Sequence, residues 1–296
     1  MLNNRYFEIT QESTGSLQIQ VNDTNIGKPI GNAQVKIKDE NNNTIEELIT
    51  DNSGQTPIIN LSTPPIEYSL DEEQNIRPYA IYNLETTTND FRKVFVNGTQ
   101  VISNSLALQE INTELINTEN SDLPIEINIS PNKLFGDFEP KIPEDSVKTL
   151  KPPTGQVVLD QVVIPEYIVV HDGVPSNSSA KNYYVPFKDY IKNVACSEIY
   201  STWPDATLRA NILAIISFAL NRVFTEWYRN KGYDFTITSS TAYDHAFVYG
   251  RNIYKSISII VDEMFNTYIT KFGIRQPLLA QYCDGKRVSD RKSTRL

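Results

Sequence analysis

The chain has 296 residues, of which 40% are hydrophobic and 21% are charged, so it is long enough for two domains and too apolar to be disordered throughout. Its formal net charge of −9 disfavours nucleic acid or an anionic membrane as a partner, because phosphate binding requires clustered Lys and Arg. The two cysteines, Cys196 and Cys283, are far apart and have no metal-ligand spacing around them. We therefore expect no disulfide framework, no metal and no cofactor.

The first residues give no sign of targeting to a membrane or to secretion. Residues 1–14 contain Asn, Arg, Glu and Gln and lack an apolar segment, so we expect no signal peptide. No run in the sequence reaches the ~18 apolar residues that a membrane span needs.

Residues 1–138 have the pattern of a β-domain. Apolar residues alternate in several short runs, which places each set on one face of a half-buried strand, and turn-forming residues separate the runs. This pattern predicts an antiparallel β-sandwich. The alternating sets are Leu17, Ile19 and Val21; Ala33, Val35 and Ile37; and Ile125, Ile127 and Ile129. The expected turns are Gly27-Lys28-Pro29, Asn41-Asn42-Asn43, Asn52-Ser53-Gly54 and Asn97-Gly98.

The segment Gly15–Leu61, with its apolar alternation and its Pro29–Ala33 and Thr50–Gly54 turns, resembles the carboxypeptidase-regulatory or transthyretin-like β-sandwich. That resemblance implies a spacer, a chaperone or a binding module. No catalytic cluster is evident in this part of the sequence.

A proline-rich segment follows at 139–156. It contains Pro140, Pro143, Pro152 and Pro153 among charged and small residues, which favours an exposed, semi-rigid linker. The alternative is an ordered loop packed on one domain.

Helical periodicity dominates residues 157–289. After a strand-like run at Tyr167–Val170, the apolar residues between Phe187 and Val194 fall on one helix face. A longer helix should begin at Pro204 or Asp205 and run to about Asn230, and a third should span roughly Asn252 to Ile269. We expect this second domain to be mainly helical with a small β part.

The last residues of the sequence do not continue the helical pattern. Residues Leu279–Val288 predict a hairpin around a type I′ turn at Asp284-Gly285. The tail 290–296 does not continue that pattern, so we expect a non-native tail and an incomplete domain.

Glu198 is the first candidate for chemistry. It lies where an apolar helix should end, just before Tyr200, Trp203 and Pro204. A carboxylic acid held beside aromatic rings is desolvated and has a raised pKa, as a general acid for glycoside cleavage requires. The alternative is a surface or capping glutamate.

The polar stretch from Thr236 to His245, followed by Phe247, is the second candidate. Hydroxyl groups interleaved with aromatic rings suit a sugar-binding groove, and they equally suit an ordinary loop. The candidate substrate-binding residues are Ser239, Ser240, Thr241, Tyr243, His245 and Tyr249.

A serine-hydrolase arrangement is a further possibility. Ser239, His245 and Asp172 supply the residue types of a Ser-His-Asp triad, although nothing in their spacing demands one. More simply, His171-Asp172-Gly173 ends a strand in a turn.

The segment from Val185 to Tyr249 resembles the SpoIID/LytB family of peptidoglycan lytic transglycosylases, and in particular its spore cortex-lytic enzymes. The latter resemblance extends to Val157–Asp160 and Pro165–Gly173. The shared pattern is an aliphatic helix, Glu198, Trp203-Pro204, a helix with Leu208, Ala210, Ala214 and Ala219, then Ser240-Thr241 and Val248-Tyr249.

The resemblance implies a mechanism, a substrate and a place of action. Glu198 would protonate the muramic acid glycosidic bond and then act as base on the C6 hydroxyl, closing a 1,6-anhydro ring without a second carboxylate. The substrate would be cortex peptidoglycan during spore germination. The enzyme would be a zymogen cut near Gln156–Val157 by a subtilisin-like germination protease.

The sequence departs from the family at two points. Some members have a zinc-binding His-Cys pair near this loop, but here Ala246 follows His245, so we expect no metal. Family domains also continue beyond the hairpin, which makes the activity of a chain ending at Leu296 doubtful.

Two alternatives come from other functional classes. The first is a non-catalytic wall-binding or spore structural protein of the same fold. The second is an adhesion or carrier module joined to an unrelated helical domain.

Overall fold

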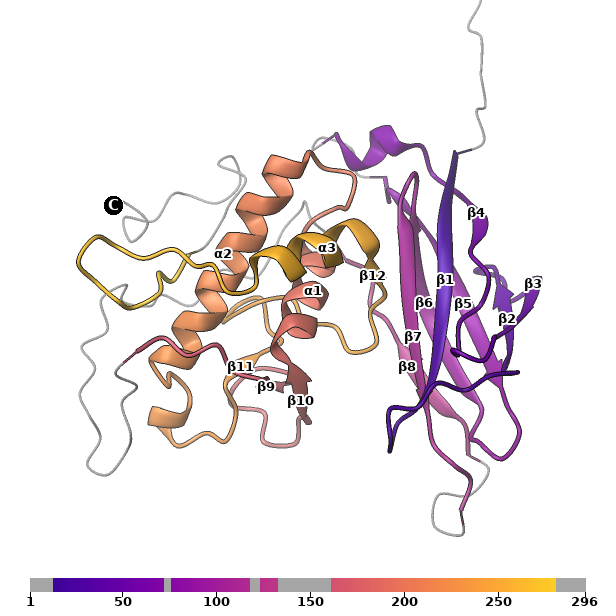
Figure 1. Ribbon diagram of the computed structural model, residues 1–296, viewed down its shortest axis with the longest axis horizontal. Helices are drawn as coiled ribbons and strands as arrows, with labels where there is room; N and C mark the ends of the chain where they lie inside the picture. Colours follow the sequence, from indigo (N-terminus) through magenta and orange to yellow (C-terminus); the bar gives the residue numbers. More distant parts are fainter. Residues whose placement is uncertain (1–12, 72–75, 118–122, 133–160, 281–296) are drawn as a thin grey trace, which may run out of the picture. The chain divides into compact units, whose positions relative to one another are not determined.

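The computed structural model describes residues 13–71, 76–117, 123–132 and 161–280. The chain divides into two compact units, Met1–Glu126 and Ile127–Leu296. Strands dominate the first unit, whereas three helices and short strands form the second (Figure 1). The protein is therefore of mixed α and β composition.

The first unit contains two sheets packed as a β-sandwich (Figure 1). One sheet joins β7, β1 and β4, and the other contains β3, β2, β5 and β6 in that order. The strands are β1 (Ser13–Asp23), β2 (Gln34–Lys38), β3 (Thr44–Ile49), β4 (Ile59–Thr63), β5 (Tyr79–Thr87), β6 (Val94–Ile102) and β7 (Leu106–Thr113), with a 3-10 turn at Ile66–Ser69. The next strand, β8 (Ile125–Asn128), includes the residues at which the chain is divided.

The core of the first unit follows the predicted alternation. Leu17, Ile19 and Val21 on β1 are all 0% exposed, and the residues between them are partly exposed. Val35 and Ile37 on β2 are equally buried. Period-2 patterning therefore identified which face of these two strands points inward.

The expectation of a purely antiparallel sandwich is wrong in one place. β1 pairs with β7 in parallel, from Ser16↔Leu106 to Asp23↔Thr113. The reason lies in the short connection after β6, where Asn104 has a φ of 56°. This turn carries the chain from one sheet into the other instead of back along β6, so no hairpin sets the direction of β7.

The turn predicted at Asn97-Gly98 is also wrong, because both residues lie inside β6. The β5–β6 register shifts between Tyr82 and Leu84, so that one residue of β5 stands opposite two of β6. Gly98 has a φ of 101°, and its N–H donates to Asn83 Oδ1 at 3.1 Å. The turn-forming pair makes a β-bulge, which requires the same positive φ as a tight turn.

The second unit combines a small sheet with three helices that pack on one another (Figure 1). β9 lies between β10, which is antiparallel to it, and β11, which is parallel to it. The elements are β9 (Tyr167–His171), β10 (Asn182–Pro186), α1 (Phe187–Glu198), α2 (Asp205–Phe224), a 3-10 turn (Arg229–Lys231), β11 (Ile237–Thr238), β12 (Ile253–Tyr254) and α3 (Lys255–Met264).

The helices are where the periodicity predicts them, but two are shorter than expected. α2 ends at Phe224 and not near Asn230, because Thr225 Oγ1 bonds back to the Asn221 carbonyl and Glu226 takes a φ of 44°. α3 begins at Lys255 because the two residues before it are extended. Apolar spacing continues through both ends, so periodicity alone could not locate them.

By length and composition α2 could cross a membrane, with a mean hydropathy of 1.3 over its apolar window. In this structure 61% of that window is buried. Core helices of globular domains pass the same test, so the helix does not show membrane insertion. The hairpin predicted around Asp284-Gly285 and the tail 290–296 lie outside the described residues, as do the linker prolines.

Candidate functional site

Glu198 is the last residue of α1 and is half-buried. The helix ends because Ile199 is extended, and the chain then turns through Tyr200 and Trp203, whose rings meet edge to face at 6.0 Å. Glu198 Oε1 accepts a 2.6 Å hydrogen bond from the backbone N–H of Ala246. The carboxyl group is therefore fixed between α1 and the loop that follows β11.

That loop, residues 239–250, is held on α1 at two further points. The Asn193 amide makes two hydrogen bonds to the backbone of Val248, donating at 2.8 Å and accepting at 3.0 Å. The Tyr190 hydroxyl lies 3.1 Å from His245 Nδ1. Burial, reinforced by the charge of Asp244, raises the pKa of Tyr190 well above its ordinary value, so this hydroxyl keeps its proton.

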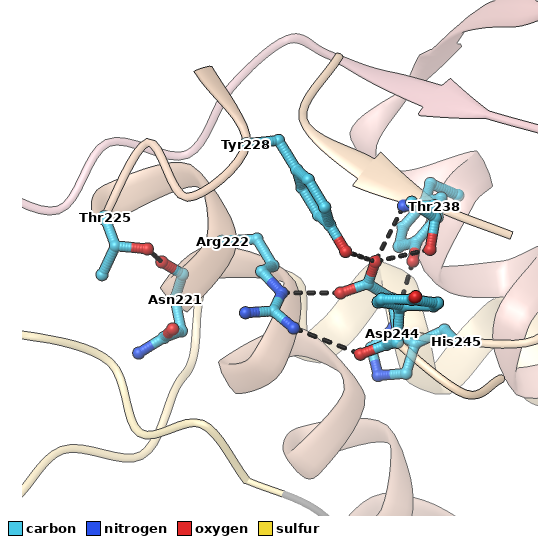
Figure 2. A network of polar contacts seen from close by, with 9 residues as sticks. Asn221, Arg222, Thr225, Tyr228, Thr238, Asp244 and His245 are labelled. Atoms are coloured by element: carbon cyan, nitrogen blue, oxygen red, sulfur yellow. Dashed lines mark hydrogen bonds and ion pairs between the residues drawn. The ribbon is translucent and has the colours of Figure 1, made fainter. Parts of the chain in front are cut away.

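A buried ion pair anchors the other side of the 239–250 loop (Figure 2). Arg222 Nε from α2 donates to Asp244 Oδ1 at 2.6 Å, and both side chains are 0% exposed. Arg222 Nη2 also donates to the carbonyl of Tyr243 at 3.2 Å. The guanidinium therefore binds two consecutive residues of the loop.

The second carboxylate oxygen of Asp244 accepts three hydrogen bonds (Figure 2). Oδ2 accepts from the Tyr228 hydroxyl at 2.6 Å and from the N–H and hydroxyl of Thr238 at 2.9 and 2.6 Å. Burial and the adjacent Asp244 charge raise the pKa of Tyr228, which keeps its hydroxyl a donor. Helix α2, the turn after it and β11 thus meet at one carboxylate.

The structure places the predicted substrate-binding residues in different surroundings. Ser239 Oγ donates to Asp172 Oδ1 at 3.1 Å on the exposed side of the small sheet. Tyr249 is 47% exposed, and its ring stacks on that of Tyr183 at 4.5 Å. The Ser240 carbonyl accepts the N–H of Tyr243 at 3.0 Å, so Ser240 shapes the loop.

Thr241 is partly exposed within the same loop. His245, by contrast, is 4% exposed, and its ring lies 4.4 Å from that of Phe218. We predicted substrate contact for His245, but the structure buries it under the loop, where it supports the backbone. Its Tyr190 bond explains why a polar residue is accommodated there.

The Ser-His-Asp alternative is only partly assembled. Ser239 and Asp172 are hydrogen-bonded directly, which leaves no place for a histidine between them. His245 Nδ1 instead meets the Tyr190 hydroxyl. A triad requires the histidine to bridge the other two residues, and this arrangement lacks that bridge.

Sequence reasoning missed Arg222, Asp244 and Tyr183. A signal existed for Arg222, because it lies at i+3 from Ala219 and i+7 from Ile215 on an apolar helix face. A buried arginine requires a partner carboxylate, and the nearest unassigned one in the polar stretch is Asp244. No comparable signal distinguishes Tyr183 from its neighbour Tyr184.

Within the described residues, no three His, Cys, Asp or Glu side chains are grouped as a metal site would need. Cys196 is a buried free thiol whose Sγ accepts the N–H of Tyr254 at 3.3 Å. Burial raises the pKa of this thiol to about 12. Its role here is packing, as expected for a small side chain in an apolar helix.

No family model matches the chain, and no curated protein matches it. Solved structures align at 16% identity with the Bacillus anthracis TIE protein (TM-score 0.26, 35% of this chain and 18% of that one) and at 15% with a minor pilin of Streptococcus agalactiae (TM-score 0.27, 37% and 48%). Klebsiella pneumoniae 5-hydroxyisourate hydrolase aligns at 15% (TM-score 0.23, 35% and 94%).

The chain thus spans less than half the length of the first two of these proteins. Similarity at this level does not indicate a shared activity. The β-sandwich described above rests on the strands of this chain itself.

Proposed function

We propose that the chain is a peptidoglycan lytic transglycosylase that cleaves spore cortex during germination, similar to the spore cortex-lytic enzyme SleC. The proposal rests on the sequence resemblance between Val185 and Tyr249. The observation that carries it furthest is the placement of Glu198 at the end of α1, with Oε1 held by the Ala246 N–H. The helical domain would then be of the SpoIID type.

This placement supports general-acid chemistry. An N–H donor on Oε1 fixes the orientation of the carboxyl group, as a positioned general acid requires. The loop that supplies the N–H is fastened to α1 and α2, so the orientation does not depend on a mobile side chain. A fixed catalytic group lowers the barrier because it does not have to be reoriented to reach the transition state.

The proposed reaction needs only one carboxyl group. Glu198 transfers its proton to the glycosidic oxygen as the bond from the muramic acid C1 breaks. The C6 hydroxyl oxygen of the same sugar then bonds to C1, and its proton returns to Glu198. The products are a shortened glycan and a 1,6-anhydro-muramic acid end, and no water is consumed. Ser239, Ser240, Thr241 and Tyr249 would bind the glycan.

The remaining parts of the proposal concern regulation and location. We infer a zymogen cut by a subtilisin-like germination protease near Gln156–Val157, a position that lies outside the described residues. The β-sandwich would be the removable part. The protein would act in the cortex or coat region of the spore, with peptidoglycan as its partner.

A non-catalytic wall-binding protein is the second candidate. The same Glu198–Ala246 hydrogen bond that orients an acid could simply fasten the loop to α1. Under this reading Glu198 is a structural residue, and the exposed tyrosine and hydroxyl groups bind glycan without turnover.

The Glu198→Gln variant separates these two functions. Gln retains an oxygen that accepts the Ala246 N–H, so the fold should persist, but its amide cannot transfer a proton. Cortex fragments digested by the full chain are analysed by mass spectrometry for anhydro-muramic ends. We expect the variant to lose activity by ~10²–10⁴-fold or more, since one residue serves both proton transfers.

Glu263→Gln is the matched control, because Glu263 is an exposed carboxylate paired with Arg209 on the surface. Its activity should equal that of the parent. If Glu198→Gln still produces anhydro-muramic ends, Glu198 is not the acid. If the parent chain produces none, the chain is not a transglycosylase.

A further inference from the structure

A series of aromatic rings runs from the core of the second unit to its surface. Tyr190 is 0% exposed and stacks on Phe247 at 5.9 Å. Phe247 lies 6.4 Å from Tyr183, which stacks in turn on Tyr249 at 4.5 Å and 14°. The outermost ring, Tyr249, is 47% exposed and therefore offers an open aromatic surface. We call Tyr183 and Tyr249 the tyrosine platform.

The platform is rigid for a surface feature. Each ring rests on another that is more deeply buried, and the innermost is hydrogen-bonded to His245. Two hydrogen bonds to Asn193 hold the backbone at Val248, directly before Tyr249. A ligand that stacks on this platform does not have to immobilise it, which removes a common entropic cost of binding.

Polar groups lie beside the platform. Asp172 and Ser239, which we call the polar rim, are joined by the 3.1 Å hydrogen bond from Ser239 Oγ. The Asp172 N–H donates to the Lys181 carbonyl at 2.8 Å, two residues before Tyr183. Tyr183 pairs with Val170 on β9, so Asp172 lies close to the platform. In agreement with this, burial raises the pKa of the Tyr183 hydroxyl and the charge of Asp172 raises it further. Among the described residues, Asp172 Oδ2 has no hydrogen-bond partner, so it can accept one from a ligand.

Tyr249, the outer ring of the platform, belongs to the same loop as the Ala246 N–H that holds Glu198. Tyr249 is three residues from Ala246, and three residues span at most roughly 11 Å. A ring stacked on Tyr249 would therefore lie within a short glycan segment of the Glu198 carboxyl group. The loop gives both features one backbone frame.

We propose that the tyrosine platform and its polar rim bind an uncharged N-acetylhexosamine ring of the glycan. The apolar face of a pyranose ring packs on an aromatic ring, and its hydroxyl or acetamido N–H donates to the rim carboxylate. The negative charge of Asp172 disfavours a sugar that bears a free carboxylate, such as muramic acid whose lactyl group carries no peptide. The inference rests on the proposed function for its substrate class.

The test uses the full chain with Glu198→Gln, so that no substrate is consumed, and a tetramer of N-acetylglucosamine as the probe in titration calorimetry. Adding Tyr249→Ala should raise the Kd about tenfold, or ~1.4 kcal/mol. Tyr184→Ala is the matched control, because Tyr184 is a neighbouring tyrosine on β10 that points to the opposite face and is 76% exposed. Its Kd should stay that of the parent.

Asp172→Asn tests whether the charge of Asp172 discriminates against a sugar that bears a carboxylate. It should improve binding of a muramic acid-containing disaccharide relative to an N-acetylglucosamine dimer, because the repelling charge is gone. The inference is overturned if the parent does not bind the tetramer, if Tyr249→Ala binds as the parent does, or if Tyr184→Ala weakens binding equally.

The outcome is separable from that of the proposed function. Anhydro-muramic ends from the parent chain combined with unaltered binding by Tyr249→Ala would refute the subsite and leave the transglycosylase standing. Tyr249-dependent binding without anhydro ends would support the subsite and refute the enzyme.

Discussion

Asp244→Asn is expected to lower the free energy of unfolding of the second unit by about 3–5 kcal/mol, because it leaves the Arg222 guanidinium buried without its carboxylate. The Asn oxygen can still accept from Tyr228 and Thr238, so the loss is mainly that of charge compensation. Replacing both charged residues with apolar ones should not restore stability, because the buried hydroxyl of Tyr228 would then lack its acceptor, at ~1–3 kcal/mol for each such donor.

The chain offers a direct way to measure this loss. Its two tryptophans, Trp203 and Trp227, both lie in the second unit, so their fluorescence during urea unfolding reports that unit alone. Arg209→Ala is the control, since it removes only exposed ion pairs and should cost at most ~1 kcal/mol. A loss below ~1 kcal/mol for Asp244→Asn would show that the ion pair does not hold the loop in place.

Three further predictions concern the thiol and the segment between the two units. Cys196 should resist alkylation at pH 8.5 in a Cys283→Ser chain until the protein is unfolded, because burial raises the pKa of its thiol from 9.0 to about 12. The stability that the protonated thiol contributes is therefore complete below pH 9.0 and is lost as the pH rises toward 12. Limited proteolysis should cut between Glu139 and Gln156 and leave two stable fragments, and cutting only elsewhere would count against an exposed linker. If the proposed processing occurs, N-terminal sequencing of the processed form should begin at or near Val157, whereas a start inside the β-sandwich would exclude the proposed activation.

Local patterns predicted the strand faces and the helices well, because burial on one side leaves a period in the sequence. Leu17, Ile19 and Val21 are the clearest case, since each is 0% exposed on one strand. The same information says nothing about which strands pair or in which direction. The parallel partner of β1 is β7, about ninety residues away along the chain, and only tertiary packing brings them together.

Local patterns predicted only part of the candidate site, because several of its contacts join residues far apart in the sequence. Glu198 stood out because it follows an apolar helix, and the structure places it where α1 ends. Its contact with Ala246, 48 residues later, is a long-range one that no local pattern encodes. The Arg222–Asp244 pair shows the limit most clearly, because a buried charge is recognised only when its partner is known.

The fastening of the 239–250 loop has a consequence for its motions. The backbone amides of Ala246 and Val248 lie in a loop, yet both donate to side chains of α1. They can exchange with solvent deuterium only when the loop detaches from that helix, so their exchange should be slow compared with that of ordinary loop amides. We do not expect a segment fastened in this way to open and close as a lid, so a ligand would meet the same loop conformation when it binds and when it leaves.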